Sequence, residues 1–363
     1  MNEVYLAGRG LASALGPDLD TGLIALSQGG VAPSRFEFAE DLAWPLYTIA
    51  EYDPDWTARA RRIALRVAEH SGALAGKRTG PLFVASSSLA LYLASSSPDM
   101  STREDGGEFH GDYQTFADTV AAWLGWRGPV FTVSTACTSC LNAMLSARTL
   151  IRNGHTDQAL ILGLELRNRV TLGGFGSMQL LAPTRALPFG EAREGLVLGE
   201  AVAALYVSSE PSRWRIAGGA NVVDGQDPAG AVPGAIVAMC HQALVNSGRE
   251  PHDIALIKPQ AAGSPVNDAS EVRALRQVFD PLPAMVSLKA AIGHTLSASG
   301  AAEVALLTAC LETGVWPRFD YAQDALLNAP LADRTPRHVR HVLANILGFG
   351  GGHAAVVLED RGA

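Results

Sequence analysis

The stretch Phe131-Thr-Val-Ser-Thr-Ala-Cys137-Thr-Ser-Cys-Leu-Asn-Ala-Met-Leu-Ser-Ala-Arg-Thr-Leu-Ile-Arg-Asn-Gly154 joins a short apolar run to a helical pattern. The run from 129 to 133 is rich in β-branched and aromatic residues and predicts a buried strand. The helical pattern ends in Arg-Asn-Gly, a combination typical of a helix C-terminus. Cys137 lies at the join, among small residues that allow a tight turn. The stretch therefore predicts a strand, an elbow and a helix, with a cysteine at the elbow.

Two interpretations of Cys137 are open on this stretch alone. At the start of a helix a sulfur faces unpaired backbone N–H groups, and these donors and the helix dipole favour thiolate over thiol. A thiolate in that position can serve as a nucleophile for covalent catalysis. The alternative is a small buried core cysteine. That second role is the one we expect of the other three cysteines, Cys140, Cys240 and Cys310.

Composition narrows the class of protein. The chain has 363 residues, of which 48% are hydrophobic, 18% are charged and 37 are glycine, and this favours an α/β enzyme with many tight connections. A formal net charge of −8 argues against a general nucleic-acid binder. The four cysteines lack the paired spacing of a metal site or a disulfide framework. We also find no signal-peptide pattern and no apolar run long enough to span a membrane, so we expect a cytoplasmic protein.

Strand and helix patterns alternate along the first half. The predicted strands lie at 4–8, 81–86, 129–133 and 158–163. The predicted helices lie at 18–27, 58–69 and 116–124. The stretch 45–52 is expected to be irregular or weakly extended, and 96–111 to be an exposed loop. Continuous apolar strands that alternate with helices predict a mostly parallel sheet with both faces buried.

The second half repeats this order. The run 215–219 echoes the first strand, and 254–257 echoes 82–85. The stretch 285–314 again has a strand, a residue of catalytic type (His294) among small side chains, and an Ala-rich helix that ends at glycine. We infer an internal duplication with halves 1–210 and 211–363. Related halves would bring their helix starts to a common centre, so we expect Cys137 and His294 to share one pocket.

Four motifs carry a resemblance to a known family. They are Thr135-Ala-Cys137-Thr-Ser, Leu187-Pro-Phe189 with Arg193-Glu-Gly-Leu-Val-Leu-Gly199-Glu200, Ser287-Leu-Lys289 with Gly293-His294-Thr295, and Leu347-Gly-Phe349-Gly-Gly351. In this order they resemble the β-ketoacyl-acyl carrier protein synthases, the thiolase-fold condensing enzymes, over nearly the whole chain. The resemblance implies an α/β thiolase fold with αβαβα layers and two pseudo-repeated halves. It also implies a dimer paired across the central sheets.

The resemblance implies a decarboxylative Claisen condensation in fatty acid, polyketide or polyene biosynthesis. Cys137 would take an acyl group from the phosphopantetheine thioester of an acyl carrier protein, and malonyl-carrier protein would then lose CO₂ and attack it. His294 would hydrogen-bond the malonyl thioester carbonyl, with Lys289 and Glu303 orienting the imidazole. The backbone N–H groups of Cys137 and Phe349 would form the oxyanion hole, and Phe349 would gate the pocket. No bound cofactor and no metal are implied.

Gln260 stands where the family has its other histidine. The family's His-Gly-Thr-x-Thr-Pro segment corresponds here to Gln260-Ala-Ala-Gly-Ser-Pro265, and the register is set by that proline and by the acids that follow, Asp268 and Glu271. Ala262 and Ser264 therefore replace the threonines that usually hold the phosphopantetheine arm. A glutamine amide can donate a hydrogen bond to an enolate, but it cannot act as a base.

Three functional interpretations follow from this substitution. The first is a working synthase with a Cys–Gln–His site. The second is a weakly or non-catalytic subunit that resembles a chain-length factor, pairs with a competent ketosynthase and shapes its acyl tunnel, as in polyketide or aryl polyene pathways. The third is a thiolase or acyltransferase without decarboxylation. That class needs a second cysteine near the C-terminal glycines, where this chain has His353.

A cluster of arginines is the candidate docking surface for the acidic carrier protein. It consists of Arg59, Arg61, Arg62 and Arg66. Such a rim would give weak, salt-sensitive docking. A solvated helix face is the alternative interpretation of the same pattern. A second basic cluster, Arg334, Arg337 and Arg340, is the alternative docking site.

Overall fold

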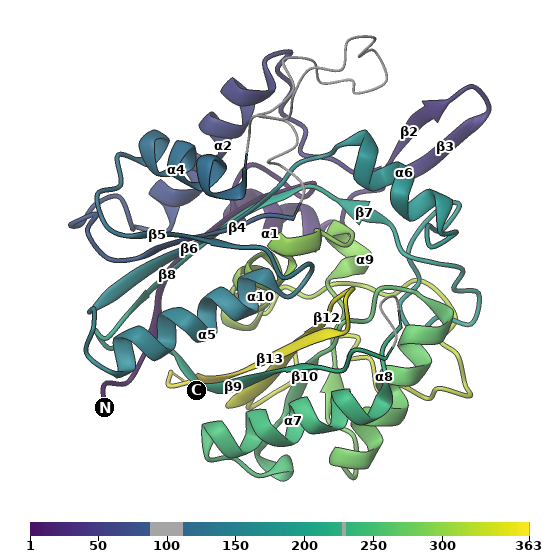
Figure 1. Ribbon diagram of the computed structural model, residues 1–363. Coiled ribbons are helices and arrows are strands. Elements are labelled where there is room, and N and C mark those ends of the chain that lie inside the picture. Colours follow the sequence, from purple (N-terminus) through teal and green to yellow (C-terminus); the bar gives the residue numbers. More distant parts are fainter. Residues whose placement is uncertain (88–111, 227–229, 363) are drawn as a thin grey trace.

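Figure 1 shows the computed structural model, which describes residues 1–87, 112–226 and 230–362. The predicted loop at 96–111 lies outside these ranges. Ten strands form one sheet in the order β11-β10-β12-β13-β9-β1-β8-β6-β4-β5. In the first half these are β1 (Tyr5–Ser13), β4 (Leu82–Ala85), β5 (Val130–Val133), β6 (Gln158–Glu165) and β8 (Ala201–Ser208). In the second half they are β9 (Trp214–Val223), β10 (Leu256–Lys258), β11 (Ala284–Met285), β12 (His341–Leu347) and β13 (Gly352–Asp360).

The strand order confirms the internal duplication. We number the five strands of each half in the order of the chain. Moving outward from the junction of β1 and β9, the strands of the first half lie in the order first, fifth, fourth, second, third. The strands of the second half lie in the same order. The two halves are joined in the sheet by the short pairing of Tyr5 with Arg215 and of Leu6 with Trp214. That 1–210 and 211–363 are separate domains stays a prediction.

The prediction of a mostly parallel sheet is wrong, because the sheet is mixed. β4 pairs in parallel with β5 and β6, and β10 with β11 and β12, whereas β8 and β13 pair antiparallel to their neighbours. The reason is visible between β12 and β13. Only 348–351 connect these strands, and so short a link allows a hairpin but no crossover.

Helices complete five layers, as the αβαβα expectation requires (Figure 1). One outer layer holds α2 (Trp56–His70) and α4 (Tyr113–Leu124), and the other holds α7 (Pro233–Ser247) and α8 (Pro265–Val278). Between the sheet halves lie α5 (Ser139–Arg152) and α10 (Ser299–Thr313). The other α-helices among the described residues are α1 (Leu19–Ser27), α6 (Arg169–Ser177) and α9 (Lys289–Ile292). Along the described part of the chain, no helix combines the length and apolar character needed to cross a membrane.

The two central helices pack closely because glycines face them. A Cβ on Gly300, in the first turn of α10, would lie 2.9 Å from Leu141 Cγ of α5. A Cβ on Gly163 of β6 would lie 2.6 Å from Cys140 Sγ. Helix α5 ends at Arg152, with Asn153 as its C-cap and Gly154 in the left-handed region, as the sequence predicts. This close packing brings the N-terminal ends of the two helices together.

The stretch 45–52 is extended at its start, where 45–47 end β3 (Leu42–Tyr47), and irregular over 48–52, as expected. β3 pairs with β2 (Ser34–Ala39) as a hairpin and meets β7 (Leu198–Gly199) at its end. Pro45 lies opposite Arg35 within this hairpin. The hairpin packs over α6, since Gly176 contacts the Trp44 ring and Gly173 contacts the Phe38 ring.

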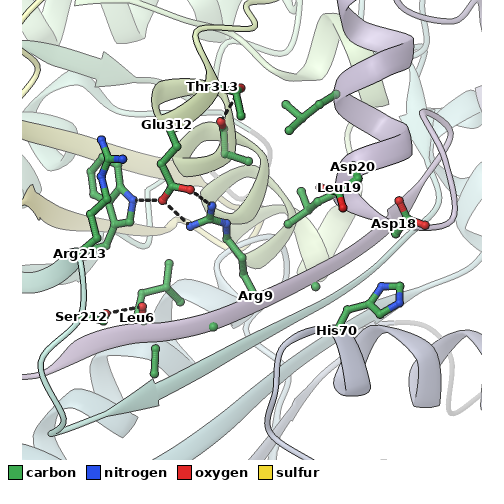
Figure 2. A pocket seen from close by; sticks show the side chains of 16 residues that line it. Leu6, Arg9, Asp18, Leu19, Asp20, His70, Ser212, Arg213, Glu312 and Thr313 are labelled. Carbon is green, nitrogen blue, oxygen red and sulfur yellow. Dashed lines mark hydrogen bonds and ion pairs between the residues drawn. The ribbon is translucent and has the colours of Figure 1, made fainter. Parts of the chain in front are cut away.

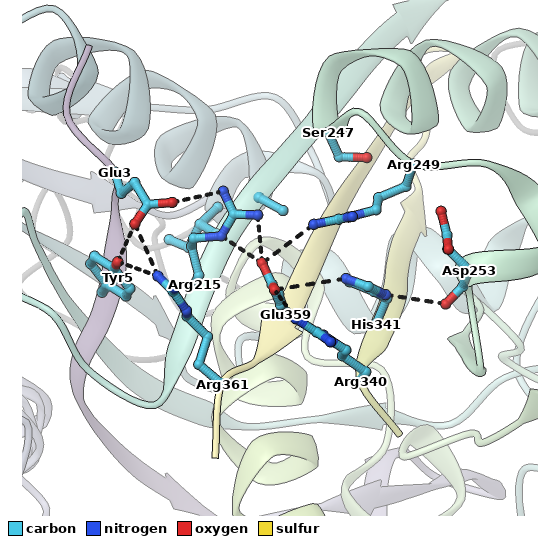
Figure 3. A network of polar contacts seen from close by, with 12 residues as sticks. Glu3, Tyr5, Arg215, Ser247, Arg249, Asp253, Arg340, His341, Glu359 and Arg361 are labelled. Carbon is cyan, nitrogen blue, oxygen red and sulfur yellow. Dashed lines mark hydrogen bonds and ion pairs between the residues drawn. The ribbon is translucent and has the colours of Figure 1, made fainter. Parts of the chain in front are cut away.

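Ion pairs fasten the junction between the halves. Glu359 of β13 accepts a 2.6 Å hydrogen bond from Arg215 Nε of β9, and Arg340 lies 3.4 Å away (Figure 3). Arg215 also lies 3.3 Å from Glu3, which pairs with Arg361. On the other side of β1, Figure 2 shows Arg9 paired with Glu312 of α10 at the wall of a cavity of about 680 Å³. These contacts hold α10, and therefore the residues before it, against the first half.

Candidate active site

Three tight elbows carry the candidate site residues. Ala136, Ala261 and Leu296 have positive φ angles of 49°, 36° and 50°, although none of them is glycine. Each lies within two positions of a predicted site residue, namely Cys137, Gln260 or His294. Left-handed conformations at such residues cost free energy and persist where the surroundings enforce them, often at functional sites.

Cys137 and His294 meet in one buried pocket, as expected from the duplication. The sulfur lies 3.2 Å from His294 Nε2, and the two residues are each 3% exposed. Cys137 precedes α5, whose first residue is Ser139, so the sulfur lies at the helix start. The other three cysteines are free and buried, which agrees with their expected core role.

The expectation that the helix start favours a thiolate is wrong for this resting state. Burial raises the pKa of Cys137 to about 11, and this outweighs the Lys289 charge and the backbone N–H of Phe349, both of which lower it. The cysteine is therefore a thiol at neutral pH. The influence of the Phe349 and Cys137 backbone N–H groups on this pKa agrees with their predicted place in the oxyanion hole.

Ser299 contacts the His294 ring, while the orientation of the imidazole by Lys289 and Glu303 stays a prediction. His294 Nδ1 lies 2.9 Å from Ser299 Oγ, at the first residue of α10. Burial lowers the pKa of His294 well below its usual value, and the charges of Lys289 and Lys258 lower it further. The imidazole is therefore neutral at physiological pH. Ser299 was missed because serine is common among the small residues that follow His294.

Lys289 and Glu303, predicted as charged residues that support His294, form a buried ion pair that also includes a third residue. Lys258 Nζ lies 2.7 Å from Glu303 Oε2, while Lys289 binds the other carboxylate oxygen, and all three side chains are 1% exposed. The sequence analysis missed Lys258. The available signal was a lysine at the end of an apolar strand, directly before Pro259 and Gln260.

Gln260 reaches the same pocket. Its Nε2 lies 3.5 Å from His294 Nε2, and its backbone N–H donates a 2.7 Å hydrogen bond to Glu271. Glu271 also accepts from Ala261 N–H and Asn345 Nδ2, so this carboxylate holds the segment in place. Within the described residues, the buried Gln260 Oε1 has no hydrogen-bond partner. It is therefore available to a ligand.

Phe349 closes the pocket. Its ring stacks on Phe175 of α6 with centroids 5.2 Å apart, and Gly350 and Gly351, with φ of 83° and 74°, follow it. The space against Cys137 is about 30 Å³, the size of roughly one water molecule. Ala262 and Ser264, predicted at the phosphopantetheine arm, also line this space. That Phe349 gates this space stays a prediction.

The arginine cluster divides into different roles. Arg59 is 7% exposed and pairs with Glu200 at 2.8 Å, so the prediction that it binds a carrier protein is wrong. The spacing places this arginine on the buried side of α2. Arg62 and Arg66 are more exposed and pair with acids of the preceding loop, Glu51 and Asp53. Arg61 is exposed on the surface of α2, and its docking role stays a prediction.

No metal-binding geometry accompanies the site. Within residues 1–87, 112–226 and 230–362, no group of three or more His, Cys, Asp or Glu side chains is arranged to hold a metal ion. The polar groups around Cys137 are an imidazole, an amide, two ammonium groups and carboxylates. This set can transfer an acyl group to sulfur and stabilise negative charge beside it.

Comparisons with known proteins agree with this arrangement. The family model "Beta-ketoacyl synthase, N-terminal domain" matches residues 58–212, and the C-terminal domain model of the same family matches residues 216–320. The 3-oxoacyl-[acyl-carrier-protein] synthase 2 of Mycobacterium leprae is 29% identical over 63% of this chain and 60% of that protein. Lovastatin diketide synthase mokB of Monascus pilosus is 29% identical over 66% of this chain, but this covers only 10% of that larger protein.

Solved structures share the fold over almost the whole chain. A ketosynthase in complex with its chain length factor from Xenorhabdus doucetiae has a TM-score of 0.84 and 25% identity, and the match covers 99% of this chain and 98% of that one. The ishigamide ketosynthase/chain length factor has a TM-score of 0.85 and 20% identity, with 99% and 100% covered. The two family models together match well over half of the chain, which therefore belongs to the β-ketoacyl synthase family.

Proposed function

We propose that this chain is a β-ketoacyl-acyl carrier protein synthase that accepts an acyl group on Cys137 and condenses it with malonyl-carrier protein. The observation that carries the proposal is the 3.2 Å approach of Cys137 Sγ to His294 Nε2 in a buried pocket. Backbone N–H donors, a gating aromatic ring and buried ammonium groups surround the pair. The substrates arrive on the phosphopantetheine arm of a carrier protein, and no resident cofactor takes part.

The first half-reaction moves the acyl group. The Cys137 sulfur adds to the thioester carbonyl, and the backbone N–H groups of Cys137 and Phe349 stabilise the resulting oxyanion. The C–S bond to phosphopantetheine breaks, and the thiol proton leaves with that sulfur. Because the buried thiol has a pKa of about 11, this step requires that the entering carrier arm displace Phe349 and bring its own polar groups to the sulfur.

The second half-reaction forms the carbon–carbon bond. The malonyl C–CO₂ bond breaks, and its electron pair forms an enolate whose oxygen lies against His294 and Gln260. The enolate carbon attacks the acyl carbonyl, the bond to Cys137 breaks, and the thiolate regains a proton. A neutral imidazole and an amide N–H can each donate a hydrogen bond to the enolate, since neither needs a positive charge to do so.

Mass spectrometry of the intact protein after incubation with acyl-carrier protein tests the first step. We expect one acyl adduct, mapped to the Cys137 peptide and absent in Cys137→Ala. Cys140→Ala, which removes a neighbouring buried thiol, is the matched control and should still acylate. Absence of an adduct, with or without a co-expressed synthase subunit, would remove Cys137 from catalysis.

A chain-length-factor-like subunit is the alternative, and two observations favour it. Gln260 replaces a catalytic imidazole, and the pocket of about 30 Å³ is closed at rest. The neighbour from Xenorhabdus doucetiae is itself a ketosynthase bound to its chain length factor. In this alternative the chain pairs through the edge strand β5, whose Phe131 is 44% exposed, and an aryl polyene or polyketide pathway is the expected context.

Sedimentation of the chain purified alone, and of the chain co-expressed with a ketosynthase, separates the two roles. A self-paired dimer that acylates and turns over malonyl-carrier protein supports the synthase. A chain that pairs only with a second synthase, and whose Cys137→Ala variant leaves the activity of the pair unchanged, supports the structural subunit.

A further inference from the structure

Lysine is rare in this chain, and its placement is uneven. Of 28 lysines and arginines, only Lys77, Lys258 and Lys289 are lysines. Lys77 is exposed, whereas Lys258 and Lys289 are both buried on the carboxylate of Glu303. An arginine keeps its charge in any environment, but a buried lysine does not. Lys258 and Lys289 are therefore buried cations whose protonation can respond to the surrounding side chains.

The three buried groups do not balance in charge. Two ammonium groups share one carboxylate, which leaves an excess positive charge in a region closed to water. Glu271 adds some compensation from α8, since it raises the pKa of Lys258, but its own hydrogen bonds go to Gln260, Ala261 and Asn345. An unbalanced buried charge is costly to stability and demands a reason.

The position of Lys258 at the end of β10 indicates where the excess positive charge acts. Lys258 ends β10, and Gln260 follows two positions later, beyond the end of the strand. Gln260 Nε2 faces His294, and Lys258 is one of two charges that act on the same imidazole. The neutral amide and the extra cation therefore face one histidine from the same segment.

We propose that Lys258 is a positioning residue, which with Glu303 and Lys289 forms a buried cationic triad behind His294. The triad adds to burial in keeping the imidazole neutral, and it supplies the positive charge that Gln260 cannot carry. This inference rests on the proposed condensation. The charge stabilises the enolate that develops beside His294, and Glu303 stays fixed between two ammonium groups. A neutral side chain at 258 would leave the enolate with only Lys289 behind it.

A double-mutant cycle tests the compensation. In the natural chain, Lys258→Met and Lys258→Gln should each lower the kcat for malonyl-carrier protein decarboxylation about tenfold with little change in KM. In a Gln260→His background the same changes should cost less than about threefold, because the imidazole restores what the charge supplies. Lys77→Met is the matched control and should match the natural chain. Equal losses in both backgrounds would overturn the proposal.

The glutamine variant separates charge from hydrogen bonding. Lys258→Gln can still donate a hydrogen bond to Glu303, so it retains the contact but not the cation. If it behaves like the natural chain while Lys258→Met does not, the contact alone matters and the cationic role is lost. Either variant alone suffices for the cycle if the other does not fold.

Imidazole NMR of ¹⁵N-histidine-labelled protein supplies a test that needs no turnover. The His294 signal, assigned with His294→Gln, should titrate at higher pH in Lys258→Met and in Lys258→Gln than in the natural chain, because the Lys258 charge lowers the pKa of the imidazole. An unchanged His294 titration would overturn the role of Lys258. If the titration moves while no variant decarboxylates malonyl-carrier protein, the triad stands and the proposed function fails.

Discussion

Cys137 Sγ and His294 Nε2 lie 3.2 Å apart although 157 positions separate the two residues along the chain. The two come from equivalent helix starts of a duplicated fold, and the glycines between α5 and α10 allow that approach. Both are uncharged at rest, because burial raises the pKa of the thiol and lowers that of the imidazole. The resting pair is therefore a thiol and an imidazole, not an ion pair.

The first prediction concerns the pH dependence of Cys137 reactivity. A buried thiol with a pKa of about 11 reacts through its small thiolate fraction. Alkylation by iodoacetamide should thus rise steadily from pH 7 toward pH 11, when followed by mass spectrometry of the Cys137 peptide. Lys289→Met should slow it at every pH in this range, since the ammonium lowers the thiol pKa. A plateau below pH 8 would contradict the assignment.

The second prediction concerns Gln260→His. General acid–base and imidazole assistance contributes roughly 10²–10⁴-fold in reactions of this type, so decarboxylation of malonyl-carrier protein should increase by at least one order of magnitude. CO₂ release measures it. Gln260→Asn, which keeps the amide but shortens its reach, is the control and should not gain. No gain from the histidine would show that carrier docking or the acyl tunnel limits the rate.

The third prediction concerns the stability effect of Lys258. Its pKa falls to about 8 in the folded protein, chiefly by burial, against 10.5 for an exposed lysine. Below pH 8, Lys258 is protonated in both the folded and the unfolded protein, and the free-energy cost of burying its charge is fully present. Between pH 8 and 10.5 the folded state has already lost its proton, so stability rises with pH.

Urea unfolding of the natural chain and of Lys258→Met checks this linkage. The variant should be the more stable one at pH 7, and the difference should shrink by about 3 kcal/mol by pH 10.5, the equivalent of the pKa difference. Comparison of the two proteins cancels the titration of the buried cysteines. A difference that is constant with pH would contradict the pKa of Lys258.

The fourth prediction concerns the gate. Phe175→Ala removes the stacking partner of Phe349 and should open the pocket without touching Cys137. Cys137 alkylation should then be severalfold faster, at a stability cost of about 3–5 kcal/mol for a large buried ring. Phe83→Ala, which removes the stack on Phe131 away from the site, is the control for lost aromatic packing. Unchanged alkylation would mean that the Phe349 loop is held by its other contacts.

The fifth prediction separates two arginines of α2. Arg59→Met leaves Glu200 buried without its partner and should destabilise the fold by about 3–5 kcal/mol. Arg61→Glu lies on the exposed side and should leave the unfolding free energy nearly unchanged. It should raise the KM for acyl-carrier protein, most strongly at low salt. An unaltered KM at low salt would move the docking site to another surface.

The main outline of the fold and site was predictable from local patterns. The strand–elbow–helix around Cys137, its echo around His294 and the aligned Gln260 segment are all short-range signals, and the repeated strand order follows from them. The direction of the strands was not predictable in this way, because the alternation of apolar runs is the same in parallel and antiparallel pairs. The hairpin of β2 and β3 was likewise not predicted, because it depends on pairing between the two strands.

The charge environment of the site residues could not be predicted from local patterns, because it depends on contacts between distant parts of the chain. The partner of Arg59 is Glu200, 141 positions away, and that contact turns a surface-type arginine into a buried one. Lys258 meets Glu303 across 45 positions, from a different layer. The thiolate expectation for Cys137 failed for the same reason, because a helix start lowers a pKa locally while burial by the whole fold raises it.

The stacking of Phe349 on Phe175 also bears on chemical damage. Peroxide attacks thiolates that solvent can reach, and the resting sulfur is neither ionised nor exposed. The ring beside the buried sulfur therefore protects it from peroxide in the resting state. Under the proposed function, oxidation of Cys137 should accompany the entry of substrate, because only then is the sulfur both exposed and activated.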